Sequence, residues 1–304
     1  MRSIFPPAGI RRVLTLAAAC LFLTACEPRI DLSARYAIVY GVSDYAGTGN
    51  DLNAPAADVQ AMSDLLGRKD FTPFVRTDTG ATKSNLALDV DTVTSLAGKD
   101  SFFLFYFSGH GTQVPFGGAE PGKQDSLDEC IVLYDPADIY NGCLTDDDLM
   151  RLISRIPSRQ KVVIIDACNS GGFIGDFPGV DLAPPAYSGG ISSPVSRAGE
   201  AFSKYFANTG AGDIAYTEAV VIAAAGEREE SYEQGIYGHG IFTYYFLQSP
   251  RKADANRDGY VTASEAYYFT KNAVVNIWNS RNPAYSFYPH ISGGAMDFVL
   301  FDAD

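Results

Sequence analysis

Apolar residues along the chain fall into two recurring patterns. Short runs of β-branched and aromatic residues predict strands, and longer stretches with apolar residues every three to four positions predict amphipathic helices. The predicted strands cover residues 36–42, 71–76, 101–107, 161–167, 220–225 and, as an edge strand, 296–301. The predicted helices cover residues 54–66, 85–96, 147–156, 240–247 and 263–275. This alternation predicts an α/β fold with a mainly parallel central sheet and helices on both faces.

Two of the predicted strands end in polar and glycine residues. Residues 101–107 form a continuous apolar run of the kind that is buried on both faces of a sheet, and residues 161–167 are a second buried strand. The first runs into SGHG at 108–111, and the second runs into CNSGG at 168–172. Function gathers at the carboxyl ends of parallel strands. If the two strands are neighbours, His110 and Cys168 face each other.

This pair of residue types predicts nucleophilic catalysis. A histidine beside a thiol lowers the pKa of the thiol and supplies a proton to a leaving amine. Backbone N–H groups after Cys168 would bind an oxyanion, and the glycines allow close approach by a substrate. One such residue alone is ordinarily structural, but His110 and Cys168 together predict a catalytic pair. His239 and His290 lack this context and are expected to be structural.

The net charge of the chain limits the classes of partner that it can bind. The formal net charge is −13, and the first 25 residues contain arginines but no acidic residue. Such a surface repels nucleic acid and attracts metal ions and basic peptides. With no basic stripe and no zinc-type cysteine spacing, nucleic acid is excluded as a partner.

The N-terminus has the order of a secretory signal. Arginines precede the apolar run at 13–23, and small residues follow. The run ends in LTAC at 23–26, which resembles a bacterial lipobox. This predicts a lipoprotein signal peptide at 1–25, lipid on Cys26, a tether at 26–35, and a site in the cell envelope, on the periplasmic or outer side of a bacterial membrane. The alternative is an ordinary signal peptide with an incidental cysteine.

The remaining cysteines bear on the choice of nucleophile. After removal of the signal and lipidation of Cys26, three cysteines are left in an oxidising compartment. Cys130 and Cys143 could pair with each other, which would leave Cys168 as the free thiol.

The two catalytic motifs also carry a family resemblance. SGHG at 108–111 and DACNSG at 166–171 resemble the paired signatures of caspase-like cysteine peptidases, in particular metacaspases and their bacterial relatives, the orthocaspases. The resemblance covers about residues 36–300. It includes the segments at 36–45, 52–58, 128–129, 144–147 and 240–243. Asn169 stands where metacaspases usually carry His, at a position that is not a catalytic base in that family.

The resemblance implies the fold and the activity. The fold would be a caspase-hemoglobinase-like three-layer sandwich over residues 36–304. The activity would be that of a cysteine endopeptidase with a Cys–His dyad and no obligatory third member, acting on protein or peptide substrates after Arg or Lys. Asp58 and Asp166 would be the acids of the S1 pocket, which binds the P1 side chain.

Physical chemistry supports a role for these acids. A basic P1 side chain requires a buried carboxylate in its pocket. Asp166 lies two residues before Cys168 and therefore on the same face of its strand. Asp58 begins a predicted helix, so the alternative for Asp58 is a carboxylate stabilised by the helix dipole.

One segment has the spacing of an EF-hand calcium loop. Residues 254–265 place oxygen donors at the positions that such a loop requires, with Gly259 at its sixth position. The predicted Ca²⁺ ligands are Asp254, Asn256, Asp258, Tyr260 (through its carbonyl), Thr262 and Glu265. Pro250 argues against a paired entering helix, so a single structural loop is expected. The alternative is a polar turn.

A second, looser acidic cluster follows from the resemblance. Its members approximate the metacaspase calcium site: Asp128, Asp146, Asp147 and Asp176. The alternative is a solvated acidic surface in which Asp146 is a helix N-cap.

The segment at 171–215 has no helical or strand period and is rich in Gly, Ser, Pro and Ala. In caspase-like enzymes, the stretch after the catalytic cysteine is often cut during maturation. We therefore expect a flexible linker, with autolysis after Arg197 or Lys204. The alternative is a loop that is never cut.

These observations together predict a lipid-anchored, calcium-stabilised or calcium-activated cysteine endopeptidase with basic P1 preference and no organic cofactor. Two other functions stay open. The first is a non-catalytic calcium-binding surface module on a caspase fold. The second is acyl transfer to an amine at the same Cys–His site.

Overall fold

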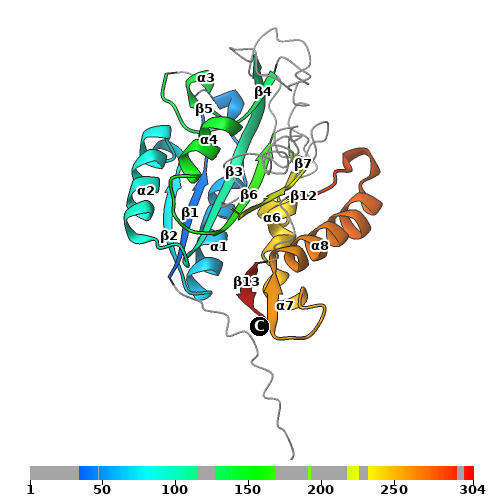
Figure 1. The fold of residues 1–304 in the computed structure, drawn as a ribbon. Helices are drawn as coiled ribbons and strands as arrows, with labels where there is room; N and C mark the ends of the chain where they lie inside the picture. The colour runs from blue at the N-terminus through cyan, green and yellow to red at the C-terminus, as the bar shows by residue number, and fades with distance from the viewer. Residues whose placement is uncertain are drawn as a thin grey trace, which may run out of the picture. The chain divides into compact units, whose positions relative to one another are not determined.

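A mixed sheet forms the centre of the fold (Figure 1). The computed structural model describes residues 34–46, 48–115, 127–137, 139–168, 191–192, 218–225, 232–292 and 298–304. Within these residues, the main path of the sheet has the strand order β12-β8-β6-β3-β1-β2. Its strands are β1 (Arg35–Gly41), β2 (Phe71–Thr77), β3 (Phe102–Pro115), β6 (Gln160–Cys168), β8 (Glu218–Ala223) and β12 (His290–Ser292). All pair in parallel except β12, which is antiparallel to β8.

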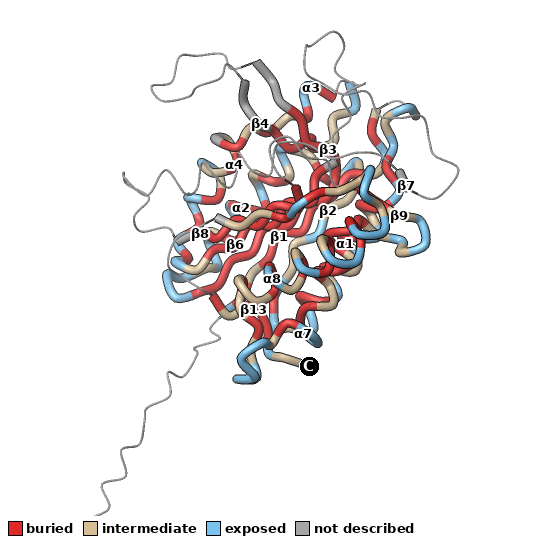
Figure 2. The backbone as a smooth tube through the Cα atoms, turned by 90° about the vertical axis from the view of Figure 1, so that its right-hand side faces the viewer, coloured by how far each residue is buried: buried red, intermediate tan, exposed pale blue. Residues whose placement is uncertain are grey.

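Helices cover both faces of this sheet. On one face lie α1 (Pro55–Arg68), α6 (Ile241–Phe246) and α8 (Ala263–Ala273), which continues as a π-helix over Val274–Asn279. On the other face lie α2 (Lys83–Leu96) and α4 (Asp146–Ile153) (Figures 1 and 2). The mainly parallel three-layer α/β architecture expected from the sequence is therefore confirmed.

Burial explains why the central strands read as continuous apolar runs. Residues 102–107 of β3 and 162–165 of β6 are almost wholly shielded from solvent, and Figure 2 shows the central strands as buried. A strand covered by helices on both faces needs apolar side chains at every position rather than at alternate ones.

Strand β3 runs further than the sequence predicted. The expected end was residue 107, because SGHG is polar and glycine-rich. In the structure β3 continues to Pro115, because its second half pairs antiparallel with β4 (Leu127–Val132), which pairs in turn with β5 (Cys143–Thr145). His110 therefore lies inside a long strand rather than after a short one.

The expected edge strand at 296–301 is wrong in its placement. Residues Val299–Asp302 form β13, which pairs with β11 (Tyr260–Thr262) in a separate two-stranded sheet. Arg35, expected in the tether, is the first residue of β1. Its guanidinium donates to the carbonyls of Val299 and Leu300, so Arg35 links β1 to β13.

A small third sheet has the order β10-β9-β7, with β7 at Ile191–Ser192, β9 at Glu233–Gln234 and β10 at His239–Gly240. Ile191 and Ser192 thus form a strand inside the segment expected to be irregular. The remaining short helices are α3 (Ile139–Gly142), α7 (Ser249–Lys252) and the 3₁₀ turns Thr48–Asn50, Asp78–Gly80 and Pro283–Tyr285. No helix among the described residues is long and apolar enough to cross a membrane.

Candidate active site

His110 and Cys168 are direct partners in the parallel ladder between β3 and β6. Two positions earlier in the same ladder, Ser108 pairs with Asp166. Side chains two residues apart point to the same face of a strand, so Ser108 and His110 share one face of β3. The structure therefore brings together the two motifs that the sequence singled out.

Tyr45 and Asn50 hold the imidazole of His110. The backbone N–H of His110 donates to the Tyr45 hydroxyl at 2.8 Å, and this hydroxyl donates to the carbonyl of Val132 at 2.9 Å. The rings of Tyr45 and His110 lie 4.6 Å apart between centroids. His110 Nε2 lies 2.8 Å from the carbonyl oxygen of Asn50.

This last contact assigns the tautomer of His110. A carbonyl oxygen can only accept, so Nε2 carries a proton, and in the neutral ring Nδ1 carries the lone pair. The imidazole is thus oriented to take up a proton at Nδ1. Gly109 is required beside His110, because a Cβ there would lie 2.7 Å from the Tyr45 hydroxyl and from the ring of Phe107.

Asp58 lies in the first turn of α1 and is completely buried. Its Oδ2 accepts from the Ser108 hydroxyl at 2.9 Å, and its Oδ1 lies 2.8 Å from Nδ1 of His239. The backbone N–H of Gly240 donates to both carboxylate oxygens at 3.2 and 3.3 Å. Burial raises the pKa of Asp58, and these hydrogen bonds oppose that rise. Asp58 therefore belongs to a buried polar cluster, and His239, which was expected to be structural, is one of its members.

Asp166 on β6 is also buried, with 2% of its surface exposed. Its Oδ2 accepts from the backbone N–H of Thr243 at 3.2 Å and from the Thr243 hydroxyl at 2.6 Å. The Tyr106 hydroxyl lies 2.7 Å from Thr243 Oγ1 and donates to it, because the single hydroxyl proton of Thr243 goes to Asp166. Burial raises the pKa of Tyr106 well above its ordinary value, and the charges of Asp58 and Asp166 add to that rise.

Gly240 marks the point where the two acids converge. A Cβ on Gly240 would lie 2.6 Å from Asp166 Oδ2 and 3.2 Å from Asp58 Oδ2. Any larger residue would push into both carboxylates, so only glycine fits. Two like charges held this close in a buried place repel each other and attract a cation.

The Glu233 carboxylate binds the residues that lead into helix α1, which carries Asp58. The helix α1 begins after Ala54, which has no side-chain oxygen to cap it. The N–H of Ala56, at the second position of the helix, donates instead to Ser43 Oγ at 3.0 Å. The buried Glu233 carboxylate accepts from Ala54 N at 2.7 Å and from the backbone and side chain of Asn53. The β9–β10 hairpin is thereby fixed to the helix that carries Asp58.

Several of these residues were not found from the sequence. Tyr45, Ser108 and Gly240 lay in segments that carried the resemblance, but no role followed for them. His239 had no local signal at all, because Asp58 and His239 are 181 positions apart.

The loop at 254–265 adopts the turns that its spacing predicts. The Asp254 carboxylate accepts from the backbone N–H groups of Asp258 at 3.2 Å and Gly259 at 3.1 Å. Glu265 reaches back to the N–H groups of Ala255 at 3.1 Å and Thr262 at 3.0 Å. Gly259 has φ +89°, which favours glycine.

The donors of this loop suit a hard cation, because all are oxygens. However, no group of three or more His, Cys, Asp or Glu side chains among the described residues is arranged so that it could hold a metal ion. The backbone turns fit a calcium loop, whereas the carboxylates are not gathered around one point.

For the second acidic cluster, the structure describes only Asp146 fully. Asp146 is buried at the start of α4, but the N-cap of this helix is Thr145, whose hydroxyl accepts from Asp148 N at 3.3 Å. The alternative that Asp146 is the N-cap is therefore wrong. The side chains of Asp128 and Asp147, and all of Asp176, lie outside the described residues.

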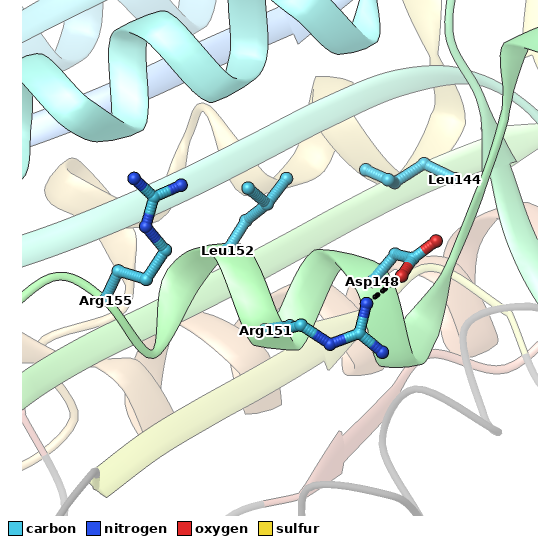
Figure 3. A pocket seen from close by; sticks show the side chains of 5 residues that line it. All are labelled: Leu144, Asp148, Arg151, Leu152 and Arg155. Atoms are coloured by element: carbon cyan, nitrogen blue, oxygen red, sulfur yellow. Dashed lines mark hydrogen bonds and ion pairs between the residues drawn. The ribbon is translucent and has the colours of Figure 1, made fainter.

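A hollow lies along α4 (Figure 3). Leu144 and Leu152 give it an apolar floor, and its charged residues are already paired, Arg151 with Asp148 and Arg155 with Asp91. Its one carboxylate, Asp148, is held in an ion pair with Arg151.

Cys130 and Cys143 are not joined in a disulfide in the structure. Burial and the adjacent Cys143 raise the pKa of Cys130 well above its ordinary value, so Cys130 is an inert thiol. The predicted lipidation site Cys26 and cleavage sites Arg197 and Lys204 lie outside the described residues.

Comparison with known proteins agrees with this architecture. The model of the caspase domain family matches residues 34–284. The solved structure of protein GSU0716 from Geobacter sulfurreducens superposes with a TM-score of 0.56 at 18% identity, over 86% of this chain and 93% of that one. At this identity the likeness shows the fold alone.

Curated relatives point in the same direction. Metacaspase-9 of Arabidopsis thaliana is 34% identical over 53% of this chain and 50% of its own length. Metacaspase-8 of the same plant is 29% identical over 46% of this chain and 38% of its own length. Metacaspase-2 of Trypanosoma brucei brucei is 28% identical over 47% and 43%. The matched region thus spans half or less of each of these relatives.

Proposed function

The chain belongs to the caspase domain family and resembles metacaspases within it, and from this premise we propose that it is a cysteine endopeptidase with Cys168 as nucleophile and His110 as its base. The observation that carries the proposal is the direct pairing of His110 and Cys168 in the ladder between β3 and β6. This backbone pairing supports an activated thiol, which needs a base beside the nucleophile and a third group that orients the base.

In the proposed reaction, His110 takes the thiol proton at Nδ1 while Asn50 holds the ring through Nε2. The Cys168 thiolate attacks the scissile carbonyl, and the tetrahedral intermediate collapses with breakage of the C–N bond. His110 gives its proton to the departing amine. A water molecule, deprotonated by His110, then hydrolyses the thioester and restores the thiol.

We propose further that the P1 residue is Arg or Lys. The buried carboxylates of Asp58 and Asp166 converge at Gly240, and Ser108, the partner of Asp166, lies two positions before His110 on β3. A guanidinium or ammonium group entering there would relieve the repulsion between the two acids. An acidic P1 residue would be repelled.

Calcium is proposed as a stabilising ion bound by the loop at 254–265. The support is the all-oxygen donor set and the backbone turns around Asp254 and Gly259. Binding would require the carboxylates of Asp254, Asp258 and Glu265 to move together. The ion would hold the beginning of α8 to β11, some distance along the chain from the catalytic pair.

A membrane anchor at Cys26 is proposed from the sequence LTAC at 23–26 after the apolar run. Metabolic labelling with an alkynyl fatty acid tests it. Wild-type protein should be labelled and Cys26→Ser protein should not, and equal labelling of both would refute the anchor.

The experiment that tests the catalytic proposal is a peptide library scanned at P1, with purified wild-type, Cys168→Ala and His110→Ala proteins. We expect cleavage after Arg and Lys by the wild type alone. Cleavage by Cys168→Ala would place the nucleophile elsewhere, and cleavage after Asp would refute the assignment of the pocket.

A further inference from the structure

His239 is in direct contact with Asp58, one of the two buried acids of the proposed S1 pocket. It follows the exposed turn Gly235–Gly238 of the β9–β10 hairpin and is the first residue of β10. Its Nδ1 lies 2.8 Å from Asp58 Oδ1. The side chain of His239 is 22% exposed and that of Asp58 is 1% exposed. Solvent can therefore exchange a proton with the imidazole, whereas the carboxylate is shielded.

The surroundings of this pair come from several elements. Asp58 belongs to α1, Tyr106 and Ser108 to β3, Asp166 to β6, and Thr243 to α6. Ser108 and Thr243 are neutral donors, and Tyr106 stays protonated because burial raises its pKa. Among the described residues around this pair, the groups that can carry a charge are therefore Asp58, Asp166, His239 and, on β9, Glu233, whose carboxylate accepts from Asn53 and Ala54.

Two such groups in contact titrate as a pair rather than separately. When the pair holds one proton, Asp58 and His239 together carry no net charge, and Asp166 alone faces an incoming cation. When the proton leaves, the pocket gains a further negative charge. The imidazole thus controls how strongly the two acids attract a basic side chain.

We propose that His239 is a specificity-determining residue that acts through Asp58, so that the proton shared by Asp58 and His239 sets the attraction of the pocket for a basic P1 side chain. This inference rests on the proposed basic P1 function. Its consequence is that binding of a cationic side chain weakens as the pair takes up its proton.

The test uses the full chain carrying Cys168→Ala, so that neither turnover nor titration of the Cys168 thiol enters the measurement. The probe is benzamidine, a small cation with the shape of an arginine head group. Its Kd is measured by calorimetry from pH 5 to 8.5. We expect the Kd to rise about tenfold as the pair takes up its proton. A tenfold change corresponds to a difference of about one unit between the pKa of the pair in the free protein and in the benzamidine complex.

His239→Asn in the same background keeps a hydrogen-bond donor beside Asp58 but cannot hold the shared proton. A pair binds its first proton at a higher pH than either member alone, so the midpoint of the Kd profile should move to lower pH by at least about one unit. His290→Asn is the matched control, because His290 lies on β12 outside the pocket, and it should leave the midpoint unchanged.

A purely structural role of His239 would weaken benzamidine binding equally at every pH and leave the midpoint in place. If the Kd profiles with His239 and with His239→Asn coincide or share a midpoint, the role of His239 is overturned and the pocket for basic side chains is left intact. Absence of benzamidine binding at any pH would overturn the pocket and this inference together.

Discussion

Asp166 and Cys168 follow one another at alternate positions of β6, and their partners across the ladder are Ser108 and His110. The residues that would select a substrate and those that would cleave it therefore lie on two adjacent strands, two positions apart along each strand. Both strands lie in the centre of the sheet, where β1 pairs with β3 up to Ser108 and β8 pairs with β6 up to Ile165, and β3 and β6 pair with each other up to His110 and Cys168. Such a site is more rigid than one built on loops.

Loss of Asp166 should remove the preference for basic P1 residues. Truncating one partner of a buried charge pair costs about 2–5 kcal/mol, so Asp166→Asn should lower kcat/KM for an Arg substrate by roughly 30- to 5,000-fold. Asp89→Asn is the matched control, because Asp89 is a buried acid that pairs with Arg76 and Tyr40 on the opposite face. It should reduce stability and leave P1 preference unchanged. An unaltered preference in Asp166→Asn would contradict the assignment.

Calcium should raise the melting temperature. A ligand that binds only the folded chain stabilises it by mass action. Glu265→Gln can keep the capping box of α8, in which Glu265 accepts from Thr262 N, but loses the charge that calcium needs. We expect this variant to lose most of the calcium increment in a thermal melt, with magnesium as the control ion. Equal melting temperatures of the wild type in chelator and in millimolar calcium would rule out the calcium site.

Lys161 should make stability depend on pH. Its Nζ is buried without a hydrogen-bond partner among the described residues, and burial lowers the pKa of Lys161 from 10.5 to about 8. Between these two values the unfolded chain binds more protons than the folded one, so stability rises with pH across this window. Below the window the cost is constant, and a shift of this size corresponds to roughly 3 kcal/mol.

Lys161→Met should therefore raise the free energy of unfolding at pH 7 by roughly 2–3 kcal/mol and flatten its rise at alkaline pH. Urea melts at a series of pH values measure both. The exposed Lys252→Met is the control and should change little. If Lys161→Met melts with the same pH slope as the wild type, the buried amine is not the cause.

Autolysis should occur after Arg197 or Lys204. An enzyme that prefers basic P1 residues has these sites tethered at high effective concentration. Intact mass measurement of wild-type protein incubated with calcium should show two fragments, which Cys168→Ala protein should not produce. Fragments in both samples would indicate a contaminating protease, and an intact wild-type chain that still cleaves peptides would show that processing is not required.

Much of the fold could be read from the sequence because its central elements have strong local signals. The runs at 36–42, 71–76 and 161–167 match β1, β2 and β6 within one or two residues. The elements that the sequence predicted less well are those whose length or partner depends on pairing with another strand. Strand β3 is lengthened by β4, and the strand at 299–302 joins β11 rather than the main sheet, neither of which a local pattern can reveal.

The same distinction applies to the site. His110, Cys168 and Asp166 could be proposed from the sequence because each lies in a motif beside an apolar strand. The contacts of Asp58 with His239 and of Asp166 with Thr243 join residues far apart in the sequence, 181 positions in the first case. These contacts depend on a distance across the folded sheet, which no spacing along the chain encodes.

Covalent labelling tests the central claim most directly. A peptidyl acyloxymethyl ketone with Arg at P1 alkylates an activated thiolate, and peptide mapping locates the adduct. We predict one adduct, on Cys168, absent in Cys168→Ala and formed about 10²- to 10⁴-fold more slowly in His110→Ala. The analogue with Asp at P1 should not react. An adduct on Cys130 or Cys143, or equal labelling by the Asp analogue, would contradict a Cys168–His110 peptidase with an acidic S1 pocket.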